Sequence, residues 1–162
     1  MQAHHFPRIA RCLEVLPEKD IWWRPNQASN SAGNLVLHLT GNVRQWIISG
    51  LGGEPDVRHR DQEFSETGPL AKRVILSRLK ATVEEAGRVI SSRTMEDLNR
   101  VHLIQGFKVT GLQAITHVVE HFALHTGQII YITKMKMQKD LGFTRLPGEK
   151  RIKARTKAPP ML

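Results

Sequence analysis

Three histidines at intervals of four residues constrain the fold of this chain more than any other feature of its sequence. His117, His121 and His125 fall within one run of nine residues. Because an α-helix advances about 100° and 1.5 Å per residue, a step of four places two side chains about 40° apart and about 6 Å apart along the axis. Two imidazoles at this spacing can bind one ion. The pattern therefore predicts a helix that presents a metal-binding face.

A second helix has to supply the third ligand of such a site. His38 lies beside an apolar stripe of helical period, and the polar residues Asn34, Asn42 and Gln45 fall within about 40° of that stripe. Three nitrogen ligands are typical of a catalytic metal site that keeps one position open. The predicted metal ligands are His38, His121 and His125, and the predicted surrounding residues are His117, Gln128 and Asn42.

Two alternative interpretations of these histidines stay open. Histidines on an apolar helix face are often hydrogen-bonded core residues that bind nothing. His117, Glu120 and His121 also stand in the His-x-x-Glu-His order of the inverted zincin peptidases. That class needs a carboxylate ligand further along the chain, where only two acidic residues follow. The peptidase interpretation also leaves His38 and His125 without a role, so we rank it second.

The ligand type predicts one divalent transition metal ion without identifying it. Neutral nitrogens suit zinc and nickel, which we favour, and also iron and copper. The repeated Glu-x-x-His of di-iron bundles is missing, which favours one ion over two. An ion with an open position lowers the pKa of a bound thiol or water, as in a metal-dependent transferase or hydrolase. The alternative is a non-catalytic module in which the ion only ties two helices together.

The composition excludes several other classes of protein. A hydrophobic fraction of 40% is ordinary for a globular domain, and no apolar run approaches the roughly 18 residues that a membrane span requires. The first residues lack the basic-then-apolar order of a signal peptide, so we expect a cytoplasmic protein. Cys12 is the only cysteine, which excludes an internal disulfide.

The formal charge of +9 is concentrated at the C-terminus. Residues 145–162 hold six basic residues and one acidic residue, with no aromatic residue among them. We interpret this segment as a basic, solvated tail that follows one metal-binding domain at residues 1–144. Without a nucleic-acid motif, any binding to DNA should be weak, sequence-independent and steeply dependent on salt. We expect no specific nucleic-acid partner and no membrane partner.

Apolar residues at helical spacing predict four helices, at about residues 3–16, 31–50, 70–90 and 111–139. Asn30 or Ser31 is the expected N-cap of the second helix, and Thr110 with Gln113 forms a capping box before the fourth. Residues 54–67 are expected to form a long connection that brings charge near the site, and residues 100–109 allow a strand or hairpin. The pattern predicts an all-α four-helix bundle with a long crossover from the second helix to the third.

Four runs of the chain resemble the DinB-like superfamily, in particular its branch of unassigned function known as domain of unknown function 1572. They are WWRPN at 22–26, NLVLHLTGNVRQW at 34–46, RHRDQEF at 58–64 and HFALHTGQI at 121–129. The resemblance extends over residues 16–139. The short first helix and the basic tail depart from the pattern of the family.

The resemblance implies an up-down-down-up bundle, commonly a homodimer. It also implies one divalent ion held by a histidine of the second helix and a histidine pair of the fourth, which correspond to His38, His121 and His125. Some members of the superfamily are similar to transferases and isomerases that use low-molecular-weight thiols such as mycothiol or bacillithiol. The resemblance therefore implies a small thiol or another small-molecule substrate.

Overall fold

The computed structural model describes residues 1–68 and 70–143, and it is mostly helical, as the periodicity predicts. The elements in chain order are α1 (His5–Val15), the 3-10 turn η1 (Glu18–Asp20), α2 (Ala32–Val43), the π-helical segment η2 (Arg44–Ser49), α3 (Arg60–Ser65), α4 (Lys72–Ser91), α5 (Met95–Asn99), β1 (Val101–Ile104), β2 (Phe107–Thr110) and α6 (Gly111–Met137). In the described ranges no helix is long and apolar enough to cross a membrane. The basic tail at residues 145–162 lies outside the described residues.

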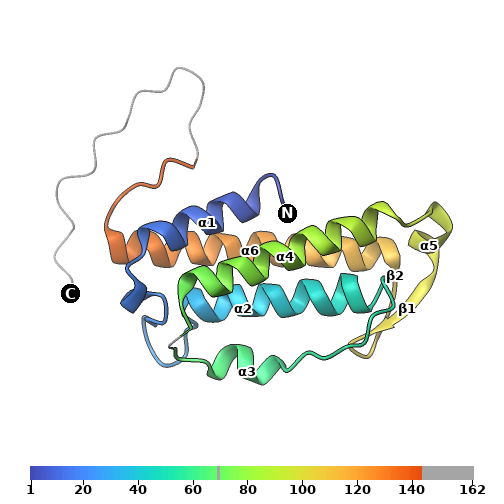
Figure 1. Ribbon diagram of the computed structural model, residues 1–162, viewed down its shortest axis with the longest axis horizontal. Coiled ribbons are helices and arrows are strands. Elements are labelled where there is room, and N and C mark those ends of the chain that lie inside the picture. The colour runs from blue at the N-terminus through green and yellow to red at the C-terminus, as the bar shows by residue number, and fades with distance from the viewer. Residues whose placement is uncertain (69, 144–162) are drawn as a thin grey trace, which may run out of the picture.

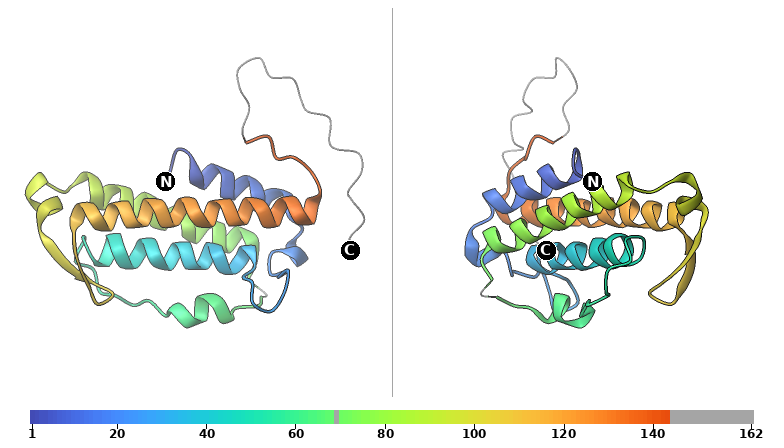
Figure 2. Two further views of the ribbon diagram at one scale, coloured as in Figure 1. Left: turned by 180° about the vertical axis from the view of Figure 1, so that it is seen from behind. Right: turned by 45° about the vertical axis from the view of Figure 1, so that its right-hand side comes forward.

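The four longest helical segments, α1, α2 with η2, α4 and α6, lie side by side (Figures 1 and 2). Helix α2 packs against α4 and α6, and α1 packs against the same two helices from the other side. Their apolar faces meet in one core, and burying each large side chain contributes about 1.5–3 kcal/mol. Fully or almost fully buried members of this core include Ile9, Leu13, Leu39, Ile47, Ile75, Leu79, Val118 and Phe122.

Capping boxes fix the beginnings of the two helices that carry the histidines. Ser31, one of the two expected N-caps, caps α2: its hydroxyl accepts from the Asn34 amide and the Asn34 side chain accepts from the Ser31 amide. Thr110 and Gln113 make the same arrangement at α6, which confirms the predicted start of that helix. Helix α6 ends two residues before the expected boundary, because Gln138 adopts a left-handed conformation with φ 49°.

The predicted second helix changes its hydrogen-bond pattern within its last turns. From Arg44 onward the segment is π-helical, with backbone bonds such as Gly50 N to Gln45 O at 2.9 Å. A Cβ at position 50 would lie 2.6 Å from Trp46 O and 2.5 Å from Ile104 Cδ1. Glycine at this position therefore allows β1 to pack directly against the end of the helix.

The hairpin that residues 100–109 allow is present, with β1 and β2 antiparallel and Ile104 paired with Phe107. Its two turn residues, Gln105 and Gly106, have φ values of 53° and 84°, as a two-residue hairpin turn of type I′ requires. Two short helices are additions to the predicted elements. Helix α3 lies within the predicted connection at residues 54–67, and α5 follows α4 with its own capping box between Thr94 and Asp97.

Candidate metal centre

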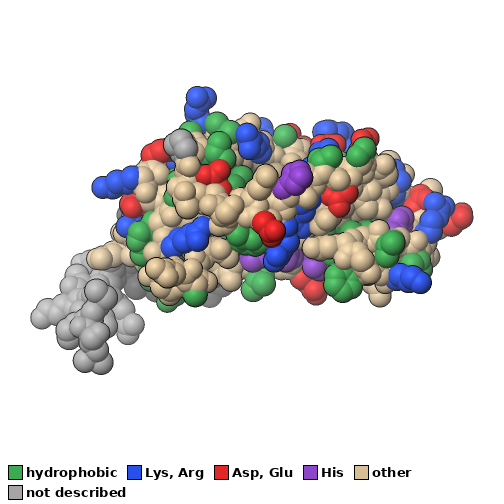
Figure 3. All heavy atoms as spheres, turned by 90° about the horizontal axis from the view of Figure 1, so that it is seen from below, with side chains coloured by type: hydrophobic (Ala, Val, Ile, Leu, Met, Phe, Trp, Pro, Cys, Tyr) green, Lys and Arg blue, Asp and Glu red, His purple; other side chains and the backbone are tan. Residues whose placement is uncertain are grey.

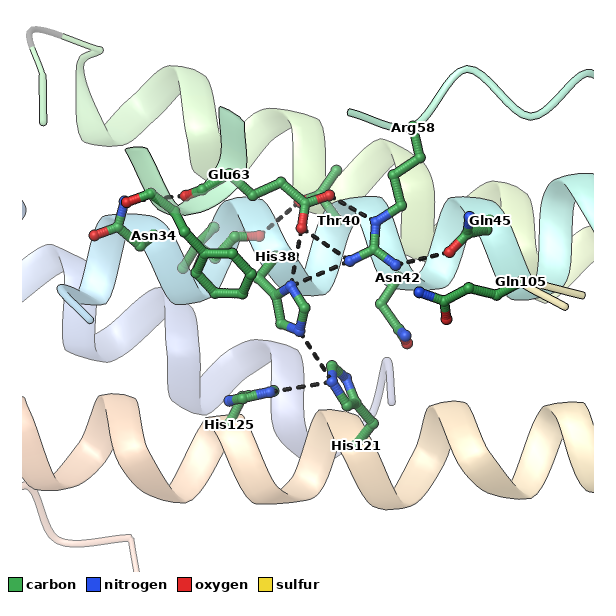
Figure 4. A network of polar contacts seen from close by, with 12 residues as sticks. Asn34, His38, Thr40, Asn42, Gln45, Arg58, Glu63, Gln105, His121 and His125 are labelled. Carbon is green, nitrogen blue, oxygen red and sulfur yellow. Dashed lines mark hydrogen bonds and ion pairs between the residues drawn. The ribbon is translucent and has the colours of Figure 1, made fainter. Parts of the chain in front are cut away.

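Helices α2 and α6 bring His38, His121 and His125 together (Figure 4). The Nε2 atom of His121 lies 3.1 Å from Nε2 of His38 and 3.1 Å from Nε2 of His125. One nitrogen from each of the three rings falls within 4.8 Å of the others. His38 is buried and the other two are partly buried. These are the three residues that the sequence predicts as ligands, on the two helices predicted to carry them.

Two of the three rings are oriented by acceptors on their outer side. His38 Nδ1 lies 2.9 Å from Glu63 Oε2, and His125 Nδ1 lies 2.6 Å from Gln128 Oε1. A carboxylate or amide oxygen can only accept a hydrogen bond, so both Nδ1 atoms carry the proton. In the neutral rings, the Nε2 atoms of His38 and His125 then present lone pairs to the centre of the group, which is the tautomer that binds a metal.

The hydrogen count at the centre fits a cation better than it fits hydrogen bonds alone. The two inward lone pairs both approach Nε2 of His121, which can carry at most one hydrogen in the neutral ring. One N–H cannot form two good hydrogen bonds to acceptors on different helices, whereas a cation attracts all three nitrogens. Separations of 3.1 Å are also near the roughly 3.3 Å between two nitrogens bound to one tetrahedral zinc ion.

Glu63 is held as a carboxylate by a buried arginine. Arg58 donates from Nε to Oε1 at 2.7 Å and from Nη2 to Oε2 at 2.8 Å, and it also donates to Gln45 Oε1. Burial alone would raise the pKa of Glu63, but the hydrogen bonds from Arg58 and His38 and the charge of Arg58 together lower it. Arg58 Nη2 and His38 Nδ1 lie 3.1 Å apart because both donate to the same carboxylate oxygen.

Two residues of α2, Gly41 and Asn34, allow Glu63 to lie close to His38. A Cβ on Gly41 of α2 would overlap the Glu63 carboxylate and would lie 2.9 Å from Arg58 Nε, so a larger residue at this position would displace the ion pair. The Asn34 side chain donates to the backbone oxygens of Glu63 at 3.0 Å and Glu66 at 2.7 Å. Asn34 therefore links the start of α2 to α3 and fixes the position of the carboxylate.

Burial favours the neutral form of the two histidines that α6 contributes to the group. Burial lowers the pKa of His121 to about 3, and the neighbouring His125, His38 and His117 add to this effect. Burial also lowers the pKa of His125, although its hydrogen bond to Gln128 acts in the opposite direction. Neutral imidazole is the form that binds a metal, so at neutral pH His121 and His125 need no deprotonation before binding.

His117 takes a different position from the other histidines of α6. Its ring stacks on Trp46 with centroids 3.9 Å apart, and its Nε2 lies 3.4 Å from Asn42 Nδ2. Asn42 is only 3% exposed, and its Oδ1 has no hydrogen-bond partner among the described residues. Glu120 is exposed, and the structure as described holds no second group of ligands with metal spacing. The geometry therefore gives the peptidase interpretation no support.

The sequence interpretation placed the segment of Arg58 and Glu63 near the site but missed what it does there. The ion pair is almost fully buried, with side chains 4% and 10% exposed, and it acts directly on His38. Phe64 packs its ring 4.6 Å from that of His38. A six-residue helix shows no measurable periodicity, so the hydrophobic pattern could not indicate α3. The only signal in the sequence was a phenylalanine directly after an acidic residue within a charged run.

From the α3 side, histidines reach the surface as small patches among charged and apolar side chains (Figure 3).

Solved structures share this fold at low sequence identity. A conserved protein of Enterococcus faecalis is 16% identical with a TM-score of 0.71, over 83% of this chain and 92% of that one. A DinB-like protein of Bacillus cereus is 15% identical with a TM-score of 0.65, over 84% and 88%. A DinB-like protein of Bacillus subtilis is 21% identical with a TM-score of 0.62, over 88% and 90%. These similarities show a DinB-like fold.

Sequence comparison identifies the family. No protein with a curated description matches this chain. The model of one family, described as protein of unknown function (DUF1572), matches residues 5–150, which is most of the chain. The match includes both helices that carry the three histidines and the segment that carries Glu63. The chain therefore belongs to the DUF1572 family.

Proposed function

We propose that this protein binds one divalent transition metal ion through His38, His121 and His125, with zinc or nickel preferred over iron or copper. The observation that carries this proposal is the convergence of three Nε2 atoms, two of which present lone pairs because their Nδ1 atoms donate outward. Neutral imidazole nitrogens suit these metals. Glu63 and Gln128 would keep the rings oriented for the ion, as acceptors behind metal-binding histidines commonly do.

We further propose that the site is catalytic and acts on a small thiol or on water. An ion held by three neutral nitrogens keeps its full positive charge, and it would lower the pKa of a thiol or water at its open position towards neutrality. Asn42 would orient the reactant, because its buried Oδ1 is free to accept a hydrogen bond. The family resemblance favours a low-molecular-weight thiol, in an S-transfer or isomerisation reaction.

The proposal includes the up-down-down-up arrangement of the four long helices. The chain direction, followed by colour in Figure 1, supports it: α2 and α4 run the same way, and α1 and α6 run the opposite way. The long connection from α2 to α4 then corresponds to the crossover that contains α3. In this arrangement the crossover has a function, since it delivers Glu63 to His38.

A structural ion is the second candidate function. The burial of His38, with 6% of its surface exposed, favours it, because a buried ligand suits an ion that holds α2 and α6 together. The two functions differ in what they predict for exchangeable ligands. A catalytic ion accepts an added thiol, whereas a structural ion has a closed set of protein ligands.

Cobalt substitution separates these possibilities. We expect one cobalt ion per chain, and we expect small thiols to produce a thiolate charge-transfer band in the wild-type protein and in His117→Ala but not in His121→Ala. A cobalt spectrum that neither an added thiol nor the ionisation of a bound water on raising the pH alters would contradict the catalytic proposal and leave the structural one. The absence of stoichiometric cobalt or zinc from correctly folded protein would contradict both.

A further inference from the structure

A pocket of about 700 Å³ lies beside the candidate metal centre, between α6 and the segment that precedes α2. Its walls include Leu35, Leu124 and Tyr131, and none of its lining residues carries a charge. The volume falls within the roughly 300–1,000 Å³ of pockets that bind small molecules. The pocket is open to solvent, with Leu124 and Tyr131 61% and 67% exposed, but its lining offers an ionic group no counter-ion and therefore favours an uncharged molecule.

One residue belongs to both the pocket and the histidine group. Gln128 lines the pocket, and its Oε1 accepts the hydrogen bond from His125 Nδ1 at 2.6 Å. Its amide nitrogen makes no hydrogen bond with the rest of the described chain. Two N–H groups are therefore available to an acceptor in the pocket. A carbonyl oxygen bound there would be linked to His125 through the side chain of Gln128.

A glycine keeps this space open. Gly127 lines the pocket in the middle of α6, although glycine is the poorest helix former except proline. Its backbone needs no left-handed conformation, and a Cβ added there would meet no atom within 4 Å. Neither conformation nor packing therefore requires glycine. The consequence of its missing side chain is an unobstructed pocket wall.

We propose that this pocket binds an uncharged, largely apolar small molecule with a carbonyl group that accepts hydrogen bonds from Gln128. The substrate role of this molecule rests on the proposed function of the metal centre. Its binding in the pocket does not depend on that function. The apolar residues would contact one side of its body, and Gln128 would align its polar end next to His125. The pocket thus assigns a substrate class to the site: neutral carbonyl compounds.

The test uses a neutral fluorescent carbonyl probe, 6-propionyl-2-(dimethylamino)naphthalene, with the full-length metal-loaded protein. We expect one bound probe per chain, with blue-shifted emission. Gly127→Leu should weaken its binding at least tenfold while thermal stability and metal content are maintained. Thr116→Leu is the matched control: it lies on the same exposed face of α6, about 16 Å away along the axis, and should leave binding unchanged. Met135→Trp, a second change that fills the pocket, should act like Gly127→Leu.

Three results would overturn the assignment. The first is equal probe affinity in Gly127→Leu, Met135→Trp and Thr116→Leu. The second is tighter binding of an anionic naphthalene sulfonate than of the neutral probe. The third is a dimer that dissociates in Gly127→Leu, which would show that a second copy of the chain occupies the pocket. If the wild-type protein binds the probe but holds no metal, the proposed function and the substrate role are refuted. The pocket would then still be a binding site for the probe.

Discussion

His117 and His125 lie four residues before and four residues after His121 on the same helix, yet their surroundings differ completely. His125 lies at the end where His38 faces α6, and its ring is oriented by Gln128. His117 lies at the other end, where its ring stacks on Trp46 and its Nε2 faces Asn42. Residue type, helix and spacing are the same. The facing helix therefore decides which histidine joins the group.

The difference lies in the partners that each ring meets. Opposite His125, helix α2 offers an imidazole backed by a carboxylate, whereas opposite His117 the end of α2 offers an amide and η2 offers an indole. An amide and an indole can hold a ring in place, but they supply no nitrogen lone pair. The interval of four residues makes two pairs of possible ligands, His117 with His121 and His121 with His125. The residues that face them from the second helix determine which pair can bind the ion. Substitutions at the two ends should therefore have different effects on metal binding.

The largest expected effect is on metal affinity. His125→Ala should weaken zinc binding by more than about 100-fold, because it removes a proposed ligand, whereas His117→Ala should weaken it by less than about tenfold. His38→Ala and His121→Ala should resemble His125→Ala. Competition with a chelating dye measures all four affinities. Equal losses in His117→Ala and His125→Ala would show that the two ends are equivalent.

The second effect is on stability and comes from the carboxylate at the His125 end. Glu63→Ala leaves the Arg58 side chain, which is 4% exposed, without its counter-ion, and should lower the free energy of unfolding by about 3–5 kcal/mol. It should also weaken metal binding by about 10–100-fold. Glu84→Ala breaks an exposed ion pair with Lys80 and should cost about 0–1 kcal/mol. Urea denaturation compares the two, and similar losses would contradict the role of the buried pair.

How much of this contrast the sequence predicts depends on the range of the interaction. The spacing of His121 and His125, the polar edge around His38 and the capping box at Thr110 are local patterns, and they correctly placed these residues on two facing helices. The role of Glu63 depends on a contact across 25 residues, made possible by Gly41 and held by Asn34. The short-range periodicity of the sequence does not indicate such a contact. The stacking of His117 on Trp46 also joins residues far apart in the sequence, and it was missed for the same reason.

The third effect is a pH dependence of the metal-free protein. Burial lowers the pKa of His121 to about 3, against about 6.5 in the unfolded chain, so the unfolded state binds more protons between these values. Stability should therefore fall as the pH decreases from about 6.5 towards about 3, and His121→Asn should reduce this fall. Thermal unfolding of chelator-treated protein across this range measures it. The same slope in both proteins would contradict the buried, neutral state of His121.

The smallest effect concerns association. The hairpin beside the His117 end exposes Val101 and Leu103, which lie on one face of β1, to 61% and 72%, and exposed apolar side chains grouped on one face commonly mark contacts between copies. We expect a homodimer in sedimentation experiments, and we expect it to persist in His121→Ala, because these residues lie outside the histidine group. A single 18.4 kDa species at micromolar concentration would contradict this expectation.

X-ray absorption spectroscopy of the zinc-loaded protein tests the central claim most directly, because it counts the imidazoles bound to the ion. We expect three imidazole nitrogens at about 2.0–2.1 Å in the wild type and the same three in His117→Ala. The His125→Ala protein, loaded at excess zinc, should retain at most two. Four imidazoles in the wild type, reduced to three in His117→Ala, would contradict the account by making both ends of the histidine series ligands.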